Sequence, residues 1–148
     1  MTIGVTVCPI GRAFQRRKHL LMRMLLIDDD PLLIEALPTA LKRRLPHSTI
    51  TTALSAREGL DQLQVERFDV ILTDLWMSGM HGDEFTTRMN TITGCTPVIL
   101  MTGVIESSGE ILPANLFAVV RKPFDVDVLA QTILSATANS NPSCFQAS

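Results

Sequence analysis

Apolar positions follow two different spacings along the chain. Short continuous apolar runs are typical of buried strands, and stretches in which apolar residues recur every three to four positions are typical of helices. The short runs predict strands at residues 24–27, 48–53, 70–73, 98–101 and 118–121. The periodic stretches predict helices at residues 31–45, 83–92 and 105–112, and after the caps at residues 55 and 125.

Polar residues and prolines mark the predicted helix ends. Asp30 precedes Pro31 and is predicted to cap the first helix, because proline suits the first helical position. Pro38 lies inside the same helix and predicts a kink or a shortened first part. Residues 55–58 form a capping box, and Asp125 can cap the last helix. These local signals agree with the apolar pattern.

Strands and helices alternate five times, which predicts an α/β protein with a parallel sheet covered on both faces. The expected fold is a flavodoxin-like, doubly wound sheet of five strands in the order 2-1-3-4-5 with five helices. The fourth helix, residues 105–112, has the weakest pattern, because it contains Gly109 and is followed by Pro113.

The length of 148 residues favours one domain. We expect residues 1–23 to be an N-terminal extension, residues 24–138 to be the domain and residues 139–148 to be a flexible C-terminal tail. The net charge of −2 and the short basic run at residues 16–18 do not indicate a nucleic-acid partner. No apolar run approaches the roughly 20 residues that would span a membrane.

Three cysteines, Cys8, Cys95 and Cys144, are widely separated in the sequence. Their odd number and wide spacing fit neither a zinc site nor a disulfide framework. A reducing interior is therefore expected, and the predicted location is the cytoplasm.

Polar side chains follow four of the five predicted strands. Asp28 and Asp29 come after the first strand, Asp74 after the third, Thr102 after the fourth and Lys122 after the fifth. All strands of a parallel sheet end at one edge, where open α/β sheets bind ligands. The order 2-1-3-4-5 makes these four strands consecutive neighbours, so the five side chains are expected to converge.

Carboxylates, a hydroxyl and an ammonium in one crevice suit phosphoryl transfer. Oxygen ligands with few carboxylates suit Mg²⁺. An Asp carboxylate can attack phosphorus to form an aspartyl phosphate. An ammonium and a hydroxyl can stabilise the charge of the transferred group.

Four fragments, "LLIDDDP", "FDVILTDLWM", "PVILMTG" and "VVRKPF", make the chain resemble the receiver domain of two-component response regulators over residues 24–138. The resemblance is to the stand-alone type. It implies that Asp74 accepts phosphate from a sensor histidine kinase or a histidine phosphotransfer protein. It also implies that Mg²⁺ is bound by Asp29, Asp74 and the backbone carbonyl of Trp76, with Asp28 acting through a metal-bound water.

The resemblance further implies that Thr102 and Lys122 contact the phosphoryl group and that the Lys122–Pro123 peptide bond is cis. Phosphorylation is then expected to switch a protein-binding surface toward a downstream target. The expected function is signalling and not enzymatic turnover. A homodimer, where one forms, is expected to use the face of the fourth helix, fifth strand and fifth helix.

Position 119 departs from the family. Many receivers carry Tyr or Phe three residues before the lysine, whereas this chain has Val119. Phe117 shares a strand face with Val119 by period 2 and is a candidate substitute. The sequence therefore does not indicate how phosphorylation would change the conformation of the domain. At the rim of the site, the Trp76 side chain is a candidate shield of the phosphoryl bond against water, whereas His81 is expected to be a surface residue at a helix start.

Two other functions are compatible with parts of the sequence. In a haloacid-dehalogenase-type Mg²⁺ phosphohydrolase, Asp28 would be the nucleophile of an Asp-x-Asp pair. That family needs a further acidic motif well after its lysine, and here only Asp125 and Asp127 follow closely. A pseudo-receiver would bind a partner without phosphorylation, but the chain retains every side chain of the phosphorylation site.

Overall fold

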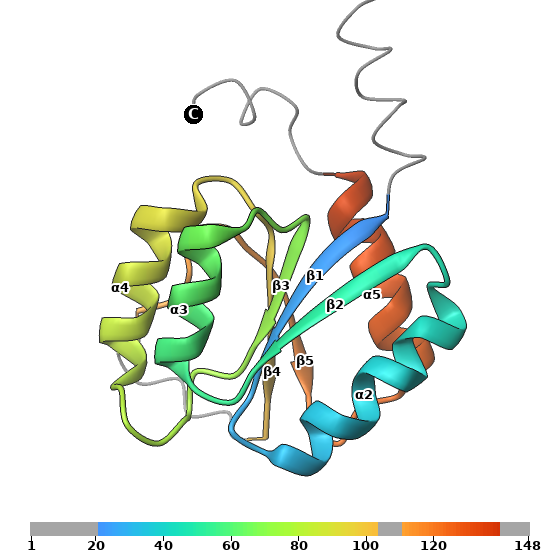
Figure 1. The fold of residues 1–148 in the computed structure, drawn as a ribbon, viewed down its shortest axis with the longest axis horizontal. Coiled ribbons are helices and arrows are strands. Elements are labelled where there is room, and N and C mark those ends of the chain that lie inside the picture. Colours follow the sequence, from blue (N-terminus) through green and yellow to red (C-terminus); the bar gives the residue numbers. More distant parts are fainter. Residues whose placement is uncertain (1–20, 104–110, 140–148) are drawn as a thin grey trace, which may run out of the picture.

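Five parallel strands form one sheet in the order β2-β1-β3-β4-β5 (Figure 1). The computed structural model of the chain describes residues 21–103 and 111–139. The strands are β1 (Met22–Ile27), β2 (Ser48–Ala53), β3 (Val70–Thr73), β4 (Val98–Thr102) and β5 (Leu116–Arg121). The predicted strand order is confirmed.

Two helices cover each face of the sheet (Figure 1). One face carries α2 (Pro31–Arg44) and α5 (Val126–Ala138), and the other carries α3 (Ala56–Val65) and α4 (Gly82–Thr93). None of these four helices, the ones found within the described residues, is long and apolar enough to cross a membrane. Most of the helix predicted at residues 105–112 lies outside the described residues, and residues 111 and 112 are not helical.

The side chains of β1 explain why its sequence is continuously apolar. Met24 and Leu26 pack into a core cluster with α2 and α5, whereas Leu25 and Ile27 pack into a second cluster with α3 and α4. Successive strand side chains point to opposite faces, and here both faces are covered. All four side chains are fully buried.

Strand β1 begins two residues earlier than predicted. The Met22 amide donates to the carbonyl of His47 at 2.8 Å, and the Arg23 amide donates to Asp69 Oδ2 at 2.8 Å. Met22 and Arg23 therefore belong to the sheet and not to the predicted extension. The predictions for residues 1–20 and 140–148 lie outside the described residues.

Helix α2 continues through Pro38, so the predicted shortening is wrong. A proline at this position removes one hydrogen bond of the helix. Leu37 and Leu41, on either side of it, are buried against the sheet. Tertiary packing stabilises most helices in proteins, and here it outweighs the lost hydrogen bond.

The predicted caps are confirmed. Asp30 Oδ1 accepts the amide two residues later at 3.0 Å, and Asp125 Oδ1 does the same at the start of α5 at 2.7 Å. Ser55 Oγ accepts the Glu58 amide at 3.1 Å, and Glu58 Oε2 accepts the amide of Leu54 at 2.9 Å. Each helix start thus satisfies backbone donors that have no partner within the helix.

Cys95 lies just beyond the end of α4 and is disulfide-bonded. The prediction that the cysteines form no disulfide is therefore wrong at this residue. Wide spacing in the sequence does not exclude a disulfide.

Candidate functional site

The carboxyl ends of four strands bring the predicted site residues to one edge of the sheet. The Asp74 amide donates to the carbonyl of Ile27 at 3.2 Å, so the residues that follow β1 and β3 lie side by side. The Lys122 amide donates to the carbonyl of Thr102 at 2.8 Å, which joins the ends of β4 and β5. The structure thus places Asp28, Asp74, Thr102 and Lys122 at this edge, as predicted, and side-chain contacts join Asp28, Asp74 and Lys122.

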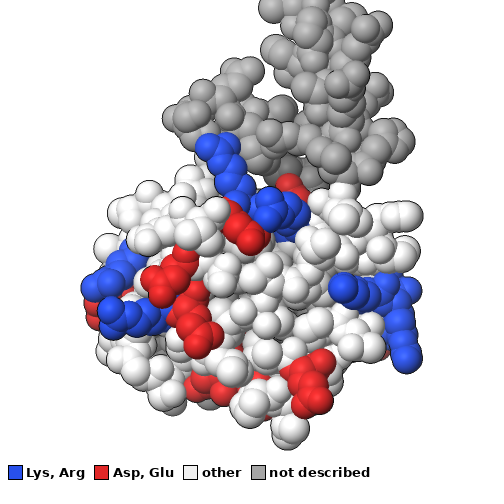
Figure 2. All heavy atoms as spheres, in the orientation of Figure 1, with Lys and Arg blue, Asp and Glu red and all other residues white. Residues whose placement is uncertain are grey.

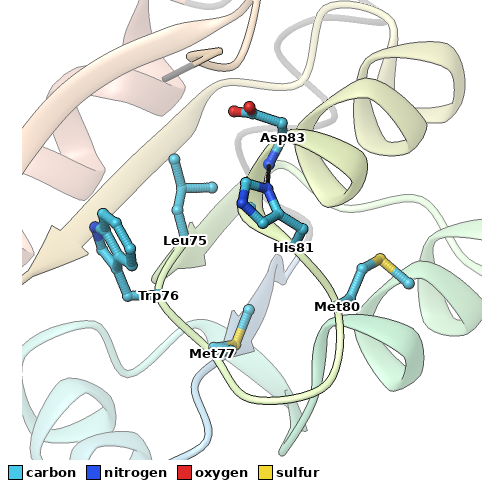
Figure 3. Close-up of a pocket in the computed structure, with 7 residues that line it drawn as sticks. Leu75, Trp76, Met77, Met80, His81 and Asp83 are labelled. Atoms are coloured by element: carbon cyan, nitrogen blue, oxygen red, sulfur yellow. Dashed lines mark hydrogen bonds between the residues drawn. The ribbon is translucent and has the colours of Figure 1, made fainter. Parts of the chain in front are cut away.

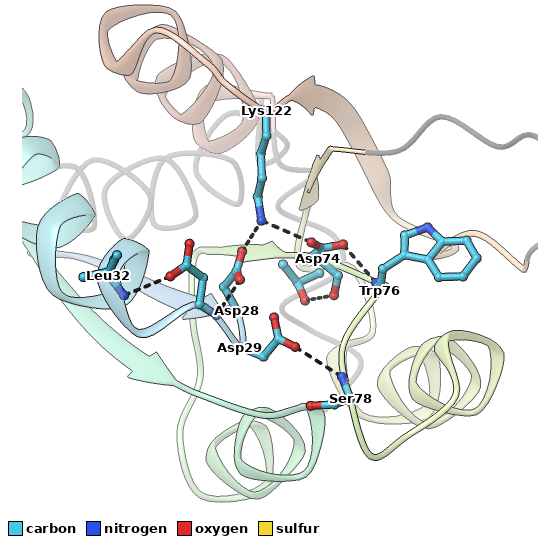
Figure 4. Close-up of polar contacts among 9 residues, drawn as sticks. Asp28, Asp29, Leu32, Asp74, Trp76, Ser78 and Lys122 are labelled. Carbon is cyan, nitrogen blue, oxygen red and sulfur yellow. Dashed lines mark hydrogen bonds and ion pairs between the residues drawn. The ribbon is translucent and has the colours of Figure 1, made fainter.

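The Lys122 ammonium lies between two carboxylates (Figure 4). Its Nζ is 2.5 Å from Asp28 Oδ2 and 3.1 Å from Asp74 Oδ2. Asp28 is only 1% exposed and Asp74 only 7% exposed. Carboxylates at such low exposure are costly without a charged partner, and Lys122 supplies one to both.

The same contacts shift the pKa of Lys122. Burial lowers this pKa, but the hydrogen bonds to Asp28 and Asp74 and the charges of the two carboxylates together outweigh burial and raise it above 10.5. The ammonium therefore stays protonated at neutral pH, where it can neutralise negative charge at this edge.

Hydrogen bonds from the neighbouring residues Thr73 and Trp76 fix the orientation of Asp74. Its Oδ1 accepts the amide of Trp76 at 2.9 Å, and the Thr73 hydroxyl donates to its main-chain carbonyl at 2.9 Å. The Trp76 side chain is 51% exposed and points away from the carboxylates, at the rim of the site (Figure 4). Asp74 is thus held by the loop that follows it.

The three consecutive acids have different surroundings. Asp28 is buried, and its Oδ1 accepts the amide of Asp30 at 3.0 Å. Asp29 is exposed, and its Oδ2 accepts the amide of Ser78 at 3.3 Å (Figure 4). Asp30 caps α2, as predicted. Two of the three acids therefore face the site, and the third belongs to the helix.

The contact between Asp29 and Ser78 was not predicted. This hydrogen bond connects the residue after β1 to the loop between β3 and α4. That loop turns at Gly79, whose φ of 102° lies in the region that favours glycine. A Ser-Gly pair is typical of a turn, but nothing in the sequence indicates which side chain such a turn will contact.

The oxygen-rich edge suits a hard cation in its donor types. Within residues 21–103 and 111–139, no three His, Cys, Asp or Glu side chains are already grouped closely enough to hold a metal ion. Asp28 and Asp74 instead share the ammonium of Lys122, and Asp29 lies one residue away with an exposed carboxylate. Acidic side chains also gather on the lower edge of the molecule in Figure 2, the side where the strands end in Figure 1. Mg²⁺ is usually bound through one or two carboxylates and keeps several waters, so an edge with these donors suits it.

Strand β5 carries an irregularity beside position 119. Val98 pairs with Leu116 and Ile99 pairs with Ala118, which leaves Phe117 without a partner residue in β4. This bulge interrupts the alternation from which Phe117 was predicted to substitute for an aromatic residue at 119. Both Phe117 and Val119 are exposed. The predicted cis peptide bond between Lys122 and Pro123 is present.

Curated relatives match the chain over part of their own length. The transcriptional regulatory protein GlrR of Escherichia coli is 32% identical over 126 residues, which is 84% of this chain and 28% of GlrR. The protein-glutamate methylesterase/protein-glutamine glutaminase 3 of Pseudomonas aeruginosa is 31% identical over 93 residues, covering 63% of this chain and 28% of that protein. The chain thus spans just over a quarter of either relative.

Solved receiver structures match most of the chain. A response regulator receiver domain protein from Clostridium thermocellum is 27% identical with a TM-score of 0.69. The match covers 80% of this chain and 95% of the Clostridium thermocellum chain. The chemotaxis response regulator CheY4 of Vibrio cholerae is 27% identical with a TM-score of 0.67, over 78% of this chain and 98% of its own. The family model for the response regulator receiver domain matches residues 24–134. The chain therefore belongs to the response regulator receiver domain family.

Proposed function

We propose that the chain accepts a phosphoryl group on Asp74 from a phosphohistidine, in a two-component system or phosphorelay. The observation that supports this most is the shared ammonium. Lys122 contacts both Asp28 and Asp74 at the edge where open α/β sheets bind ligands. Family membership supports the same class of signalling protein.

In the proposed step, a carboxylate oxygen of Asp74 attacks the phosphorus atom. The new P–O bond forms as the P–N bond to the donor histidine breaks, and the imidazole nitrogen keeps the electron pair. The Trp76 amide holds Asp74 Oδ1 at 2.9 Å, so the carboxylate does not have to be oriented during the reaction. Lys122 already faces Oδ2, where it can neutralise charge on the incoming group.

Mg²⁺ is the proposed cofactor, because the available donors are hard oxygens. Asp29, Asp74 and the carbonyl of Trp76 would bind it, and Asp28 would contact it through a water molecule. When bound, the ion would neutralise charge on the phosphoryl oxygens. Asp29 is exposed and accepts the Ser78 amide at 3.3 Å, a long hydrogen bond, so its carboxylate can turn toward a cation at small cost.

The proposed output is a change of conformation around β4 and β5. Contacts from Thr102 and Lys122 to the phosphoryl group would favour one arrangement of the loops after these strands. We propose that the resulting surface binds a downstream protein; family membership, and not the cysteine pattern, supports the cytoplasm as the proposed location. A sensor histidine kinase or a histidine phosphotransfer protein would supply the phosphoryl group.

Radiolabelled acetyl phosphate tests the proposal on the full-length chain. In the presence of Mg²⁺ we expect acid-stable, hydroxylamine-sensitive label on the wild type and none on Asp74→Asn. Asp61→Asn is the matched control, because Asp61 is exposed on α3. Undiminished label on Asp74→Asn would contradict the proposal. Loss of label mainly in Asp28→Asn, with turnover of phosphoesters, would favour the phosphohydrolase.

The binding-module alternative predicts a different result. A pseudo-receiver would take up no label, and its Trp76 fluorescence would not respond to Mg²⁺ at roughly millimolar concentration. A labelled wild type excludes this alternative directly.

A further inference from the structure

The two carboxylate oxygens of Asp74 contact different parts of the chain (Figure 4). Oδ1 accepts the amide of Trp76 at 2.9 Å, near the start of the loop at residues 74–81, here called the acceptor loop. Oδ2 lies 3.1 Å from Nζ of Lys122, the residue that directly follows β5. A group attached to Asp74 is therefore placed to act both on the acceptor loop and on the end of β5.

The same two parts of the chain meet again at the first turn of α4. Asp83 Oδ1 accepts the amide of Ile111 at 2.9 Å, across 28 positions of sequence. Asp83 follows the acceptor loop, and Ile111 begins the segment at residues 111–115 that leads into β5, here called the entry segment. We propose that Asp83 couples the acceptor loop to the entry segment of β5, so that both change conformation when Asp74 is phosphorylated.

A second side chain of α4 holds the entry segment farther from the site. Asn90 Oδ1 accepts the amide of Ala114 at 3.0 Å, about two helical turns after Asp83. Both contacts satisfy main-chain donors that lie outside helices and strands. The entry segment is thus fixed to α4 at two points, of which the Asp83 contact is the one next to the acceptor loop.

The acceptor loop has room to shift. A cavity of about 350 Å³ lies against it, lined by residues 75–77 and 80–83 (Figure 3). The Asp83 amide donates to His81 Nδ1 at 3.3 Å, which connects the loop to the start of α4. In Figure 3, the Asp83 carboxylate points away from this cavity. A shift of the loop is therefore expected to move the oxygen atom that the Ile111 amide contacts.

The proposed phosphorylated state gives this shift a direction. In that state the Trp76 carbonyl would turn toward the site to bind Mg²⁺, and the acceptor loop would follow it. The entry segment would stay in place, because Asn90 holds the Ala114 amide. Hydrogen bonds weaken steeply once their geometry is lost. We therefore expect the contact between Asp83 and Ile111 to be closed before phosphorylation and open after it.

This coupling needs no aromatic residue at position 119. Val119 is exposed, and the bulge at Phe117 interrupts the strand just before it. The contact between Asp83 and Ile111 acts instead on the residues that lead into β5, ahead of both positions. The coupling rests on the proposed phosphorylation of Asp74, and it names the side chain that would transmit it.

Amide hydrogen exchange of the full-length chain, followed by NMR, tests the proposal. The chain is compared with and without Mg²⁺ and beryllofluoride, a mimic of the phosphoryl group. We expect the Ile111 amide to exchange about tenfold faster with the mimic bound, because it loses its acceptor. The Ala114 amide is the internal control and should not change, because Asn90 still accepts from it.

Variants of Asp83 separate the hydrogen bond from the charge. In Asp83→Ala the Ile111 amide should exchange fast with or without beryllofluoride. Asp83→Asn is the matched control, because its Oδ1 can still accept, and it should respond like the wild type. Coupling is reciprocal, so Asp83→Ala should also bind beryllofluoride about threefold more tightly. Asn90→Ala removes the farther contact and should bind the mimic as the wild type does.

The possible failures can be told apart. A wild type that binds no beryllofluoride and takes up no phosphoryl label would overturn the proposed phosphorylation and the coupling with it. A wild type that binds the mimic while the Ile111 amide exchanges at an unchanged rate would overturn the coupling alone. A response of the Ile111 amide in Asp83→Ala equal to that of the wild type would also overturn it.

Discussion

Lys122 supplies the positive charge next to two buried carboxylates at the acidic edge, the strand ends that carry Asp28, Asp29 and Asp74. Asp28 is nearly inaccessible and Asp74 is 7% exposed, and Lys122 contacts both. Removing one partner of a buried ion pair leaves the other charge uncompensated, which costs more than the pair itself contributes. In the proposed function the same ammonium neutralises the phosphoryl group. In that proposal, one residue has a structural role before phosphorylation and a chemical role during it.

The raised pKa of Lys122 predicts a loss of stability at high pH. A cation whose pKa is higher in the folded state stabilises the fold below its unfolded value, 10.5, and this contribution disappears as the pH rises through the folded pKa. The chain contains no tyrosine, so fewer groups titrate in this range. Urea unfolding between about pH 9 and 12 should show this decline in the wild type.

The Lys122→Met variant should be less stable than the wild type at pH 8 and should lose less stability above pH 10.5. Lys42→Met is the control, because Lys42 is exposed in the last turn of α2. Equal pH dependence in the wild type and Lys122→Met would contradict this assignment.

Trp76 offers a prediction about the lifetime of the phosphorylated state. Its exposed indole lies at the rim of the site, two residues after the proposed acceptor, and a turn of this side chain toward Asp74 would hinder the approach of water. If Asp74 is phosphorylated, Trp76→Asn should lose label faster, and a tenfold increase would correspond to about 1.4 kcal/mol of barrier. Trp76→Phe keeps a large apolar side chain and should stay close to the wild type. An unchanged or slower loss of label in Trp76→Asn argues against shielding.

At the scale of elements, helix α3 lies unusually close to β1 at Gly59. A Cβ atom there would lie 2.5 Å from Ile27 Cδ1 and 2.9 Å from Ile27 Cγ1. Ile27 is fully buried and cannot move aside freely. Overpacking costs about 1–3 kcal/mol, whereas alanine gains about 1 kcal/mol in helix propensity. We expect Gly59→Ala to destabilise the fold by about 1 kcal/mol in urea unfolding.

The Ile27→Val background provides the control for this contact. Valine lacks the Cδ1 atom that meets the new Cβ, so Gly59→Ala should cost less there than in the wild type. Double-mutant cycles measure this coupling directly. The same cost in both backgrounds would show that the close approach is not the cause.

The elements were predictable where the signals are local. The positions of the strands and the caps at Asp30 and Asp125 follow from apolar runs and capping residues that lie within a few positions of one another. The start of β1 depends on hydrogen bonds to His47 and Asp69, which are distant in the sequence. The bulge at Phe117 likewise depends on pairing with β4. Neither pairing can be predicted from the sequence of the strand itself.

The site was predictable for a related reason. Strand ends of a parallel sheet meet at one edge, so residue type and position were enough to bring Asp28, Asp74 and Lys122 together. Loop conformation has no such rule. The contact of Ser78 with Asp29 and the cap made by His81 depend on how one loop turns, and only the structure supplies that information.

At the scale of the whole molecule, the acidic edge exists only when the fold is complete. Lys122 meets Asp28 across 94 positions of sequence and Asp74 across 48. An unfolded chain holds no such cluster, so an ion that binds there must stabilise the folded state. If Mg²⁺ binds as proposed, its concentration should shift the melting temperature of the entire domain.

Variants of two neighbouring acids, Asp29 and Asp30, test which carboxylate binds Mg²⁺. A concentration of Mg²⁺ ten times its dissociation constant should stabilise the fold by about 1.4 kcal/mol, measurable as a rise in melting temperature. Asp29→Asn should abolish the rise, because it removes a proposed ligand. Asp30→Ser keeps the cap of α2 and removes an equal charge from the next residue, so the rise should persist. Loss of the rise in Asp30→Ser but not in Asp29→Asn would mean that the wrong acid was assigned to the metal. Equal reductions in both variants would indicate general charge screening, because only a bound ion can distinguish two adjacent carboxylates that point in different directions.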